Sequence, residues 1–263
     1  MDMSSVTKRV SEVKQPRGGY IKPSQFELRQ LDDGQFLFEN ENIHASIVGM
    51  AVDYLTRLSM GASTEEAFYI SFEGAKWASL SGLPNAVELA HNLAAGIKGI
   101  DEQSIVNACK LTTFDVWRRN RAAAPLAKRA EEIFPDNYTI HNIQTMVTRS
   151  IDFWQEYGPI VKDGFTFECE GYTSTVDSGD GDFLTSDTMW DFKVSKAKPT
   201  NKHTLQLLMY WIMGQHSGKA EFNNITKLGI FNPRLNSVYT LDISKIEANI
   251  IKTIESDVIC YQN

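Results

Sequence analysis

The chain has 263 residues, of which 42% are hydrophobic and 22% are charged, and its formal net charge is −7. This composition is ordinary for a globular protein, and the length suits one domain with an insertion or two domains. The N-terminus is polar and no run of about eighteen apolar residues occurs, which argues against a signal peptide or a membrane span and predicts a cytoplasmic protein. The acidic charge excludes a general attraction to polyanions, so a nucleic-acid ligand would need a local basic patch.

Cysteine chemistry is also restricted. Cys109, Cys169 and Cys260 are far apart and form no CxxC motif. Three cysteines cannot supply the four thiolates of an iron–sulfur cluster or a structural zinc site, so we expect them to be small buried hydrophobic residues.

Residues 1–40 contain "KQPRGGYIKPSQF", and its prolines and paired glycines predict a loosely ordered segment. Residues 41–138 then show helical spacing throughout, which predicts a helical lobe continuous with the core. The expected helices are residues 43–55, residues 64–80 capped by Ser63, one from Pro84, one from Asp101 to Trp117, and residues 124–134.

Residues 139–263 change pattern after a helix that runs from about Thr139 to Gly158, because the apolar period falls from 3.6 to 2. The expected strands are a pair within 165–176, then 181–186, 188–195, 227–232 and 237–243. Helices are expected at 200–216, capped by Thr200, and at 244–259. This order predicts an α/β fold whose mixed, twisted sheet of about five strands is flanked by helices.

The stretch "SGDGDFLTSDTMWDFKVSK" places Asp182, Asp191 and Lys193 on two short neighbouring strands. A two-residue turn at Ser186 and Asp187 puts Asp182 directly opposite Asp191. Like charges in that position destabilise a sheet, and Asp191 and Lys193 share a face because side chains alternate along a strand. Two readings follow: a polar hairpin tip, or two acids that hold a cation.

For the second reading, Mg²⁺ or Mn²⁺ is the expected ion, because such ions take one or two protein carboxylates and complete their shell with water and phosphate oxygen. Gly179 and Gly181, just before Asp182, are expected to leave room for a ligand or another backbone. Lys193 would reach the same water or the scissile phosphate.

Three motifs in order resemble the PD-(D/E)XK nuclease superfamily, specifically its RecB-like branch, which includes CRISPR-adaptation nucleases and the nuclease domains of recombination helicases. "GDGD" supplies Asp182, "DFK" supplies Asp191 and Lys193, and "QLLMY" supplies Gln206 and Tyr210. The resemblance covers residues 139 to about 260 and implies a restriction-endonuclease-like core with an N-terminal helical lobe. It further implies that Gln206 and Tyr210, on one helical face, lie beside the metal site and contact the substrate or orient the catalytic groups.

The same branch uses a histidine from an upstream helix as a metal ligand. His44 is the expected equivalent, with His91 and His141 as alternatives, and Glu170 is a further candidate ligand or substrate contact. This chain departs from many relatives because it has too few cysteines for their iron–sulfur cluster, and it has no Walker A motif.

Two basic clusters could meet a nucleic acid despite the acidic net charge. Lysines follow the second acidic strand, and "WRRNR" joins three arginines to a tryptophan, as a phosphate-tracking groove with a stacking platform would. Their members are Lys193, Lys196, Lys198 and Lys202, and Trp117, Arg118, Arg119 and Arg121. The alternative is a charged, solvated face in each case.

The expected function is therefore a Mg²⁺- or Mn²⁺-dependent deoxyribonuclease that hydrolyses DNA phosphodiester bonds through Asp182, Asp191 and Lys193, with the helical lobe helping to form the DNA channel. The alternative is a catalytically silent nucleic-acid-binding or protein-interaction module on the same fold. The sequence leaves open exonuclease or endonuclease action, strand preference and oligomeric state, and phage recombination, repair and defence are all compatible roles.

Overall fold

The computed structural model describes residues 4–168 and 170–262 of the chain, so Cys169 lies outside the described residues. The chain divides into two compact units. One unit, called the sheet unit below, combines Met1–Leu31 with Trp154–Asn263, and the other, the helical unit, is the continuous segment Asp32–Phe153. The core boundary expected at residue 139 falls near the start of one long helix, α8 (Asn137–Tyr157), whose last residues belong to the sheet unit.

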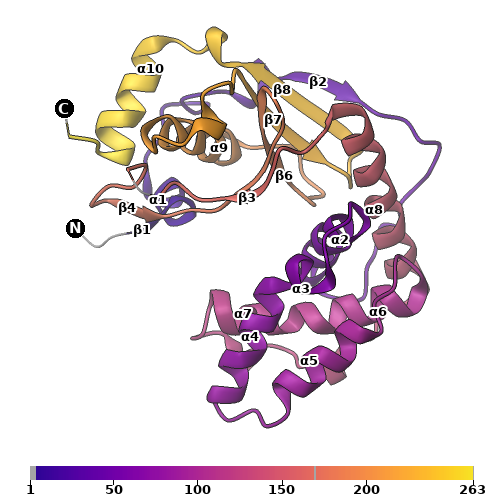
Figure 1. The fold of residues 1–263 in the computed structure, drawn as a ribbon. Helices are drawn as coiled ribbons and strands as arrows, with labels where there is room; N and C mark the ends of the chain where they lie inside the picture. Colours follow the sequence, from indigo (N-terminus) through magenta and orange to yellow (C-terminus); the bar gives the residue numbers. More distant parts are fainter. Residues whose placement is uncertain (1–3, 169, 263) are drawn as a thin grey trace. The chain divides into compact units, whose positions relative to one another are not determined.

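The sheet unit is built on a mixed sheet of six strands among the described residues (Figure 1). In spatial order they are β2 (Glu27–Gln30), β8 (Ser237–Asp242), β7 (Lys227–Asn232), β6 (Thr188–Phe192), β5 (Gly181–Leu184) and β3 (Lys162–Phe165). Only β6 and β7 are parallel, and every other neighbouring pair is antiparallel. The predicted α/β class, a mixed sheet flanked by helices, is confirmed.

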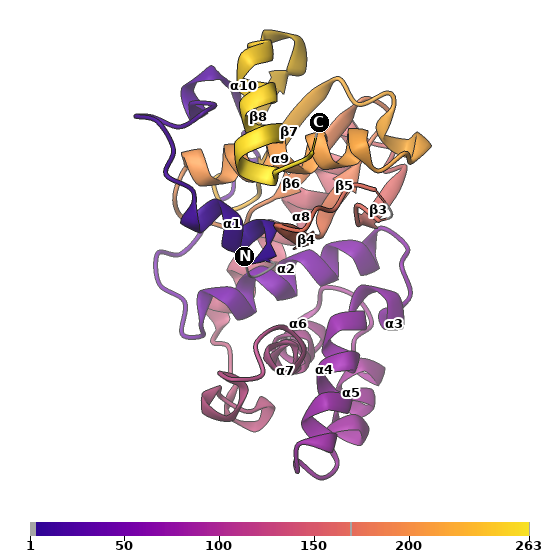
Figure 2. The same ribbon diagram turned by 90° about the vertical axis from the view of Figure 1, so that its left-hand side faces the viewer.

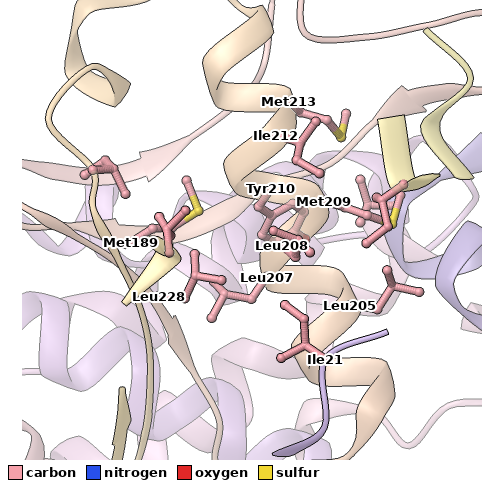
Figure 3. Packing of buried hydrophobic residues seen from close by; sticks show 14 of the residues in the cluster. Ile21, Met189, Leu205, Leu207, Leu208, Met209, Tyr210, Ile212, Met213 and Leu228 are labelled. Atoms are coloured by element: carbon pink, nitrogen blue, oxygen red, sulfur yellow. The ribbon is translucent and has the colours of Figure 1, made fainter. Parts of the chain in front are cut away.

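Helix α9 (Asn201–His216) connects the parallel strands β6 and β7 and packs against both. It is apolar on nearly all sides, which is typical of a helix buried in the core. Leu207 and Leu208 lie beside Met189 of β6 and Leu228 of β7 (Figure 3), and all four side chains are fully buried. The predicted cap is also present, since Thr200 and His203 form a reciprocal capping box at the first turn.

The side chains on the other face of β6, away from Met189, are aromatic. Trp190 meets Trp154 and Tyr157 from the end of α8 in edge-to-face contacts, with ring centroids 6.2 and 5.4 Å apart. Phe192 packs against Phe183 and Phe231, but its side chain is only partly buried. The alternation therefore directs Trp190 and Phe192 one way and Met189, Asp191 and Lys193 the other.

The first forty residues hold more structure than their prolines and glycines indicate, which corrects the expectation of a loosely ordered segment. Helix α1 (Val6–Glu12) packs on α9 through Val6 and Val10, and lies beside β4 (Val176–Ser178) (Figure 2). Strand β2 extends the sheet at its β8 edge. Long-range pairing stabilises these short elements, and local propensity does not report it.

Two other expectations are wrong in detail. The alternating pattern of residues 165–176 gives no strand pair, because the chain leaves the sheet after Phe165 and re-enters only a two-stranded ladder of β4 with β1 (Ser4–Ser5). Residues 124–134 form two short 3₁₀ turns, Ala124–Leu126 and Ala130–Glu132, in place of a helix. The predicted closing helix is present as α10 (Ala248–Thr253), which continues as a π-helix, Ile254–Ile259.

The helical unit is α-helical as predicted, and Ser63 and Asp101 cap their helices through side-chain hydrogen bonds. Its helices besides α8 are α2 (Ala45–Ser59), α3 (Thr64–Ala67), α4 (Tyr69–Leu80), α5 (Ala86–Ala95), α6 (Glu102–Leu111) and α7 (Asp115–Arg119). Among the described residues, no helix has the length and apolar character that crossing a membrane requires.

The glycine that begins β5 provides a test of how tightly the sheet unit is packed. A Cβ atom at Gly181 would lie 2.0 Å from the ring of Phe165, which is itself only 4% exposed. We expect Gly181→Ala to lower the free energy of unfolding by about 1–3 kcal/mol, as overpacking in a core does. Gly99→Ala is the matched control, because nothing lies within 4 Å of its Cβ position. Urea unfolding of both variants measures the difference, and equal stabilities would contradict the packing.

Candidate active site

The β5–β6 hairpin has the register that its sequence predicts. Phe183 pairs with Trp190 and Leu184 with Met189. Thr185 donates its backbone N–H to the Thr188 carbonyl at 3.0 Å, which closes the two-residue turn. The same register places Asp182 opposite Asp191, on one face of the sheet.

Asp191 is a buried acid, with 3% of its side chain exposed. Its Oδ1 atom lies 2.8 Å from Nζ of Lys193, whose side chain is 27% exposed. Its Oδ2 atom is buried and has no hydrogen-bond partner among the described residues. A buried carboxylate oxygen without a hydrogen-bond partner lowers the stability of the fold. Its presence here indicates a functional role or a bound cation.

Asp182 is held differently. Its side chain is partly buried, and Oδ2 accepts the backbone N–H of Phe192 at 2.8 Å. This bond replaces a rung of the ladder next to Asp191 and fixes the Asp182 carboxylate beside β6. The hairpin thereby orients two acids and one lysine on the sheet face that α9 partly covers.

Helix α9 supplies a line of polar groups to the same place. His203, Gln206 and Tyr210 are spaced i, i+3 and i+7, and therefore share a helical face. Gln206 donates from Nε2 to the Tyr210 hydroxyl at 2.9 Å. Burial raises the pKa of Tyr210, and the negative charges of Asp191, Asp182 and Asp180 raise it further against the opposing Gln206 bond. Tyr210 is therefore a neutral donor within an acidic cluster.

His203 is the residue that sequence reasoning missed. Its Nδ1 atom accepts the backbone N–H of Thr200 at 3.2 Å, so the neutral ring carries its proton on Nε2. Burial lowers the pKa of His203, Lys193 lowers it further, and Asp191 opposes them. The sequence shows that His203 lies three residues before Gln206 on the same helical face, but it does not show that this face meets Asp191 and Lys193. The charge of Asp180 near Tyr210 was not predicted either.

The glycines before Asp182 do not leave the room expected of them. The ring of Phe165 fills the space over Gly181, and Val6 and Tyr210 lie at 2.8 and 3.4 Å from a Cβ position at Gly179. These glycines let side chains of the core approach the backbone. The space beside them is therefore occupied by the protein itself.

The three candidate histidines His44, His91 and His141 lie in the helical unit, whereas both acids lie in the sheet unit. His44 is the exposed N-cap of α2, where Nδ1 accepts the Ser46 backbone N–H at 3.2 Å. His91 contacts the Phe72 ring, and His141 contacts Phe36 through its ring and through Nε2, 3.2 Å from that residue's carbonyl. The assignment of His44 as a metal ligand stays a prediction, as does a role for Glu170, which is exposed in a turn.

The basic clusters are only partly available for a ligand. Lys193 pairs with Asp191, and Arg119 joins a network around the buried Asp115, at 3.4 Å from its Oδ2 and 3.2 Å from the Tyr54 hydroxyl. Arg119 is thus structural. Lys198 and Lys202 are exposed in the sheet unit, and Arg118 and Arg121 are exposed in the helical unit.

The acidic site fits a divalent cation of the magnesium type. Such ions need only one or two carboxylates from the protein, and Asp182 and Asp191 provide two on one face, one of them with an unpartnered buried oxygen. Within the described residues no cluster of three or more His, Cys, Asp or Glu side chains is placed to hold a metal. The fit therefore rests on the two acids.

Comparison with protein-family models, with curated proteins and with solved structures found no match in any of the three. The fold and the site define an α/β protein with a mixed six-stranded sheet and a polar cluster between β5, β6 and α9.

Proposed function

We propose that this protein is a metal-dependent deoxyribonuclease with a PD-(D/E)XK-like core. The observation that carries the proposal is Asp191, a buried carboxylate with one oxygen on Lys193 and the other unpartnered, opposite Asp182. A hairpin that served only as a surface turn would leave its acids in water. The proposal is supported by the position of Asp182 on β5, Asp191 on β6, and Gln206 and Tyr210 on α9, in that chain order.

In this proposal Asp182 and Asp191 hold Mg²⁺ or Mn²⁺, which when bound lowers the pKa of water and neutralises phosphate charge. Lys193 orients the attacking water and offsets charge that develops on the phosphate. Tyr210, neutral and fixed by Gln206, offers a hydroxyl donor beside the acids. The proton on Nε2 of His203 gives the site a further donor close to Lys193.

The test is cleavage of end-labelled single-stranded and double-stranded DNA by the purified protein with Mg²⁺, with Mn²⁺ and with EDTA. Metal-dependent cleavage supports the proposal. DNA binding without cleavage under all three conditions would favour the silent binding module on the same fold, in which the Asp191–Lys193 pair is only structural. Asp187→Asn is the matched control for added variants, because Asp187 is an acid of the same hairpin that pairs outside the site with Lys227 at 2.9 Å.

The pH dependence of stability tests the state of His203 without any substrate. Its pKa in the folded protein lies below the ordinary 6.5, so as the pH falls below about 6.5 the unfolded chain binds the proton first. The free energy of unfolding therefore falls as the pH is lowered below about 6.5, and His203 does not affect it well above that pH. We expect His203→Gln to lose less stability than the wild type between about pH 6.5 and pH 5, because glutamine at this position keeps the capping bond and does not titrate.

Melting temperatures of both proteins across this range, measured in EDTA, give the comparison. Every other titrating group is common to the two proteins, so the difference between the curves isolates His203. Parallel curves would show that His203 has the same proton affinity folded and unfolded.

A further inference from the structure

A cavity lies within the helical unit, and no residue of the acidic site lines it. Its volume is about 820 Å³, within the roughly 300–1,000 Å³ typical of small-molecule sites. Residues of α5, of α7 and of the segment that follows α7 line it, among them Asn85, Trp117, Arg121, Lys128 and Arg129. We refer to it as the α5–α7 cavity.

The cavity wall carries a small excess of positive charge. Arg121, Lys128 and Arg129 are exposed, and no ion pair of their side chains exists within the described residues. Two carboxylates, Glu88 and Glu131, also line the cavity without pairing with these cations, so three positive groups against two negative ones leave a formal net charge of +1. A concave surface focuses such a field on an anion more strongly than a flat one does.

The first turn of helix α5 forms another part of the wall. Helix α5 has ten residues, with Asn85 as the N-cap and Glu88 as an acidic residue of the first turn. Asn85 has a left-handed backbone (φ 65°) and makes no side-chain cap hydrogen bond, so the first N–H groups of α5 lack the usual acceptor. These N–H groups and the helix dipole favour an anion, and the Glu88 carboxylate offsets part of that effect.

Flat groups stand beside the cations. The Arg121 guanidinium lies 3.4 Å from the centroid of the Trp77 ring, a contact that holds it in one orientation. The indole of Trp117, partly buried, forms another part of the wall. The wall of this one cavity thus combines cationic side chains with a flat indole.

We propose that the α5–α7 cavity binds a nucleotide, with its phosphate at the α5 N-terminus and the cations and its base against the Trp117 indole. The nucleotide is either free or part of a single strand, since both present the same chemistry. The proposal goes beyond the nuclease activity and does not depend on it, because no residue of the acidic site takes part.

Fluorescence anisotropy of a labelled thymidine hexanucleotide, measured in EDTA so that no cleavage occurs, tests the proposal on the full chain. We expect Trp117→Leu, Arg121→Gln and Lys128→Gln each to weaken binding about tenfold, since base stacking and phosphate contacts each contribute that much. Leucine keeps apolar volume but removes the stacking face. Lys128→Gln alters an exposed side chain of the cavity wall, so it remains informative if another variant unfolds.

Lys98→Gln is the matched control for Lys128→Gln, because Lys98 is an exposed lysine of the helical unit that does not line the cavity. Its affinity should stay within about twofold of the wild type. Equal losses in Lys98→Gln and Lys128→Gln would overturn the proposal, since binding would then follow general charge. Unchanged affinity in all three cavity variants would overturn it as well.

Competition separates the sources of the nucleotide. Displacement of the probe by thymidine monophosphate supports a free-nucleotide site, and displacement only by unlabelled oligonucleotide supports a strand site. Thymidine and inorganic phosphate, each with half of the recognised chemistry, should compete at least tenfold more weakly than the better of those two. A hexaglutamate peptide that competes as well as the oligonucleotide would overturn the proposal in favour of an acidic protein partner.

Discussion

Asp191→Asn should reduce DNA cleavage by a factor on the order of a thousand, because the variant removes one of the two charges that would hold the cation in the proposed reaction. The fold should tolerate the change. The ion pair with Lys193 is lost, but so is a buried charge whose second oxygen has no partner, and the two effects offset each other to within about 1 kcal/mol. Initial cleavage rates and urea unfolding, measured on the same preparation, give both quantities.

Lys193→Ala should separate the effect on cleavage from the effect on stability. It too should abolish cleavage, but it leaves Asp191 buried and unpaired, so we expect it to cost about 1–3 kcal/mol of stability. Asp187→Asn, on the same hairpin, should keep the wild-type cleavage rate. Wild-type cleavage by Asp191→Asn would remove the acidic site from the proposed reaction.

Mn²⁺ should raise the melting temperature of the wild type by several degrees. A ligand that binds only the folded state at a hundredfold excess over its Kd stabilises that state by about 2.7 kcal/mol, and the ion also relieves the repulsion between Asp182 and Asp191. The shift should be far smaller in Asp182→Asn, which keeps the shape of the side chain and removes its charge. Thermal denaturation with and without metal measures this directly.

The preference between metals tests the histidine. If His44 completes the site, Mn²⁺ should stabilise more than Mg²⁺, because imidazole suits the softer ion, and His44→Ala should erase the difference. His91→Ala and His141→Ala are the matched controls and should keep it. A shift of equal size in the wild type and Asp182→Asn would place the ion elsewhere on the protein.

The sequence was sufficient where a structural feature is local. The turn at Ser186 and Asp187 fixes the pairing of β5 with β6, and that pairing in turn fixes which residues face each other. Helix α9 and its Thr200 cap could likewise be predicted, since a continuous apolar helix needs no partner to be recognised.

Features that depend on packing between distant segments were not predictable. Strand β2 is short and all four of its residues are exposed, so its sequence shows no buried face. Only its pairing with β8 makes it a strand. The position of His203 beside Asp191 and Lys193 depends on how α9 crosses β6, which no spacing within α9 reveals. Arg119 resembled a nucleic-acid contact in sequence, but the buried charge of Asp115 requires it in the helical unit.

The discontinuity of the sheet unit has a consequence for how the protein is made. Arg9 of α1 donates from Nε to the carbonyl of Val258 at 2.8 Å, and β2 pairs with β8, so segments near one end of the described chain dock on segments near the other. During synthesis the helical unit, a continuous stretch, emerges complete while α1 and β2 still lack their partners. We therefore expect the ribosome to hold a folded helical unit and an unpaired leading segment, and the sheet to be completed only after β8 emerges and pairs with β2.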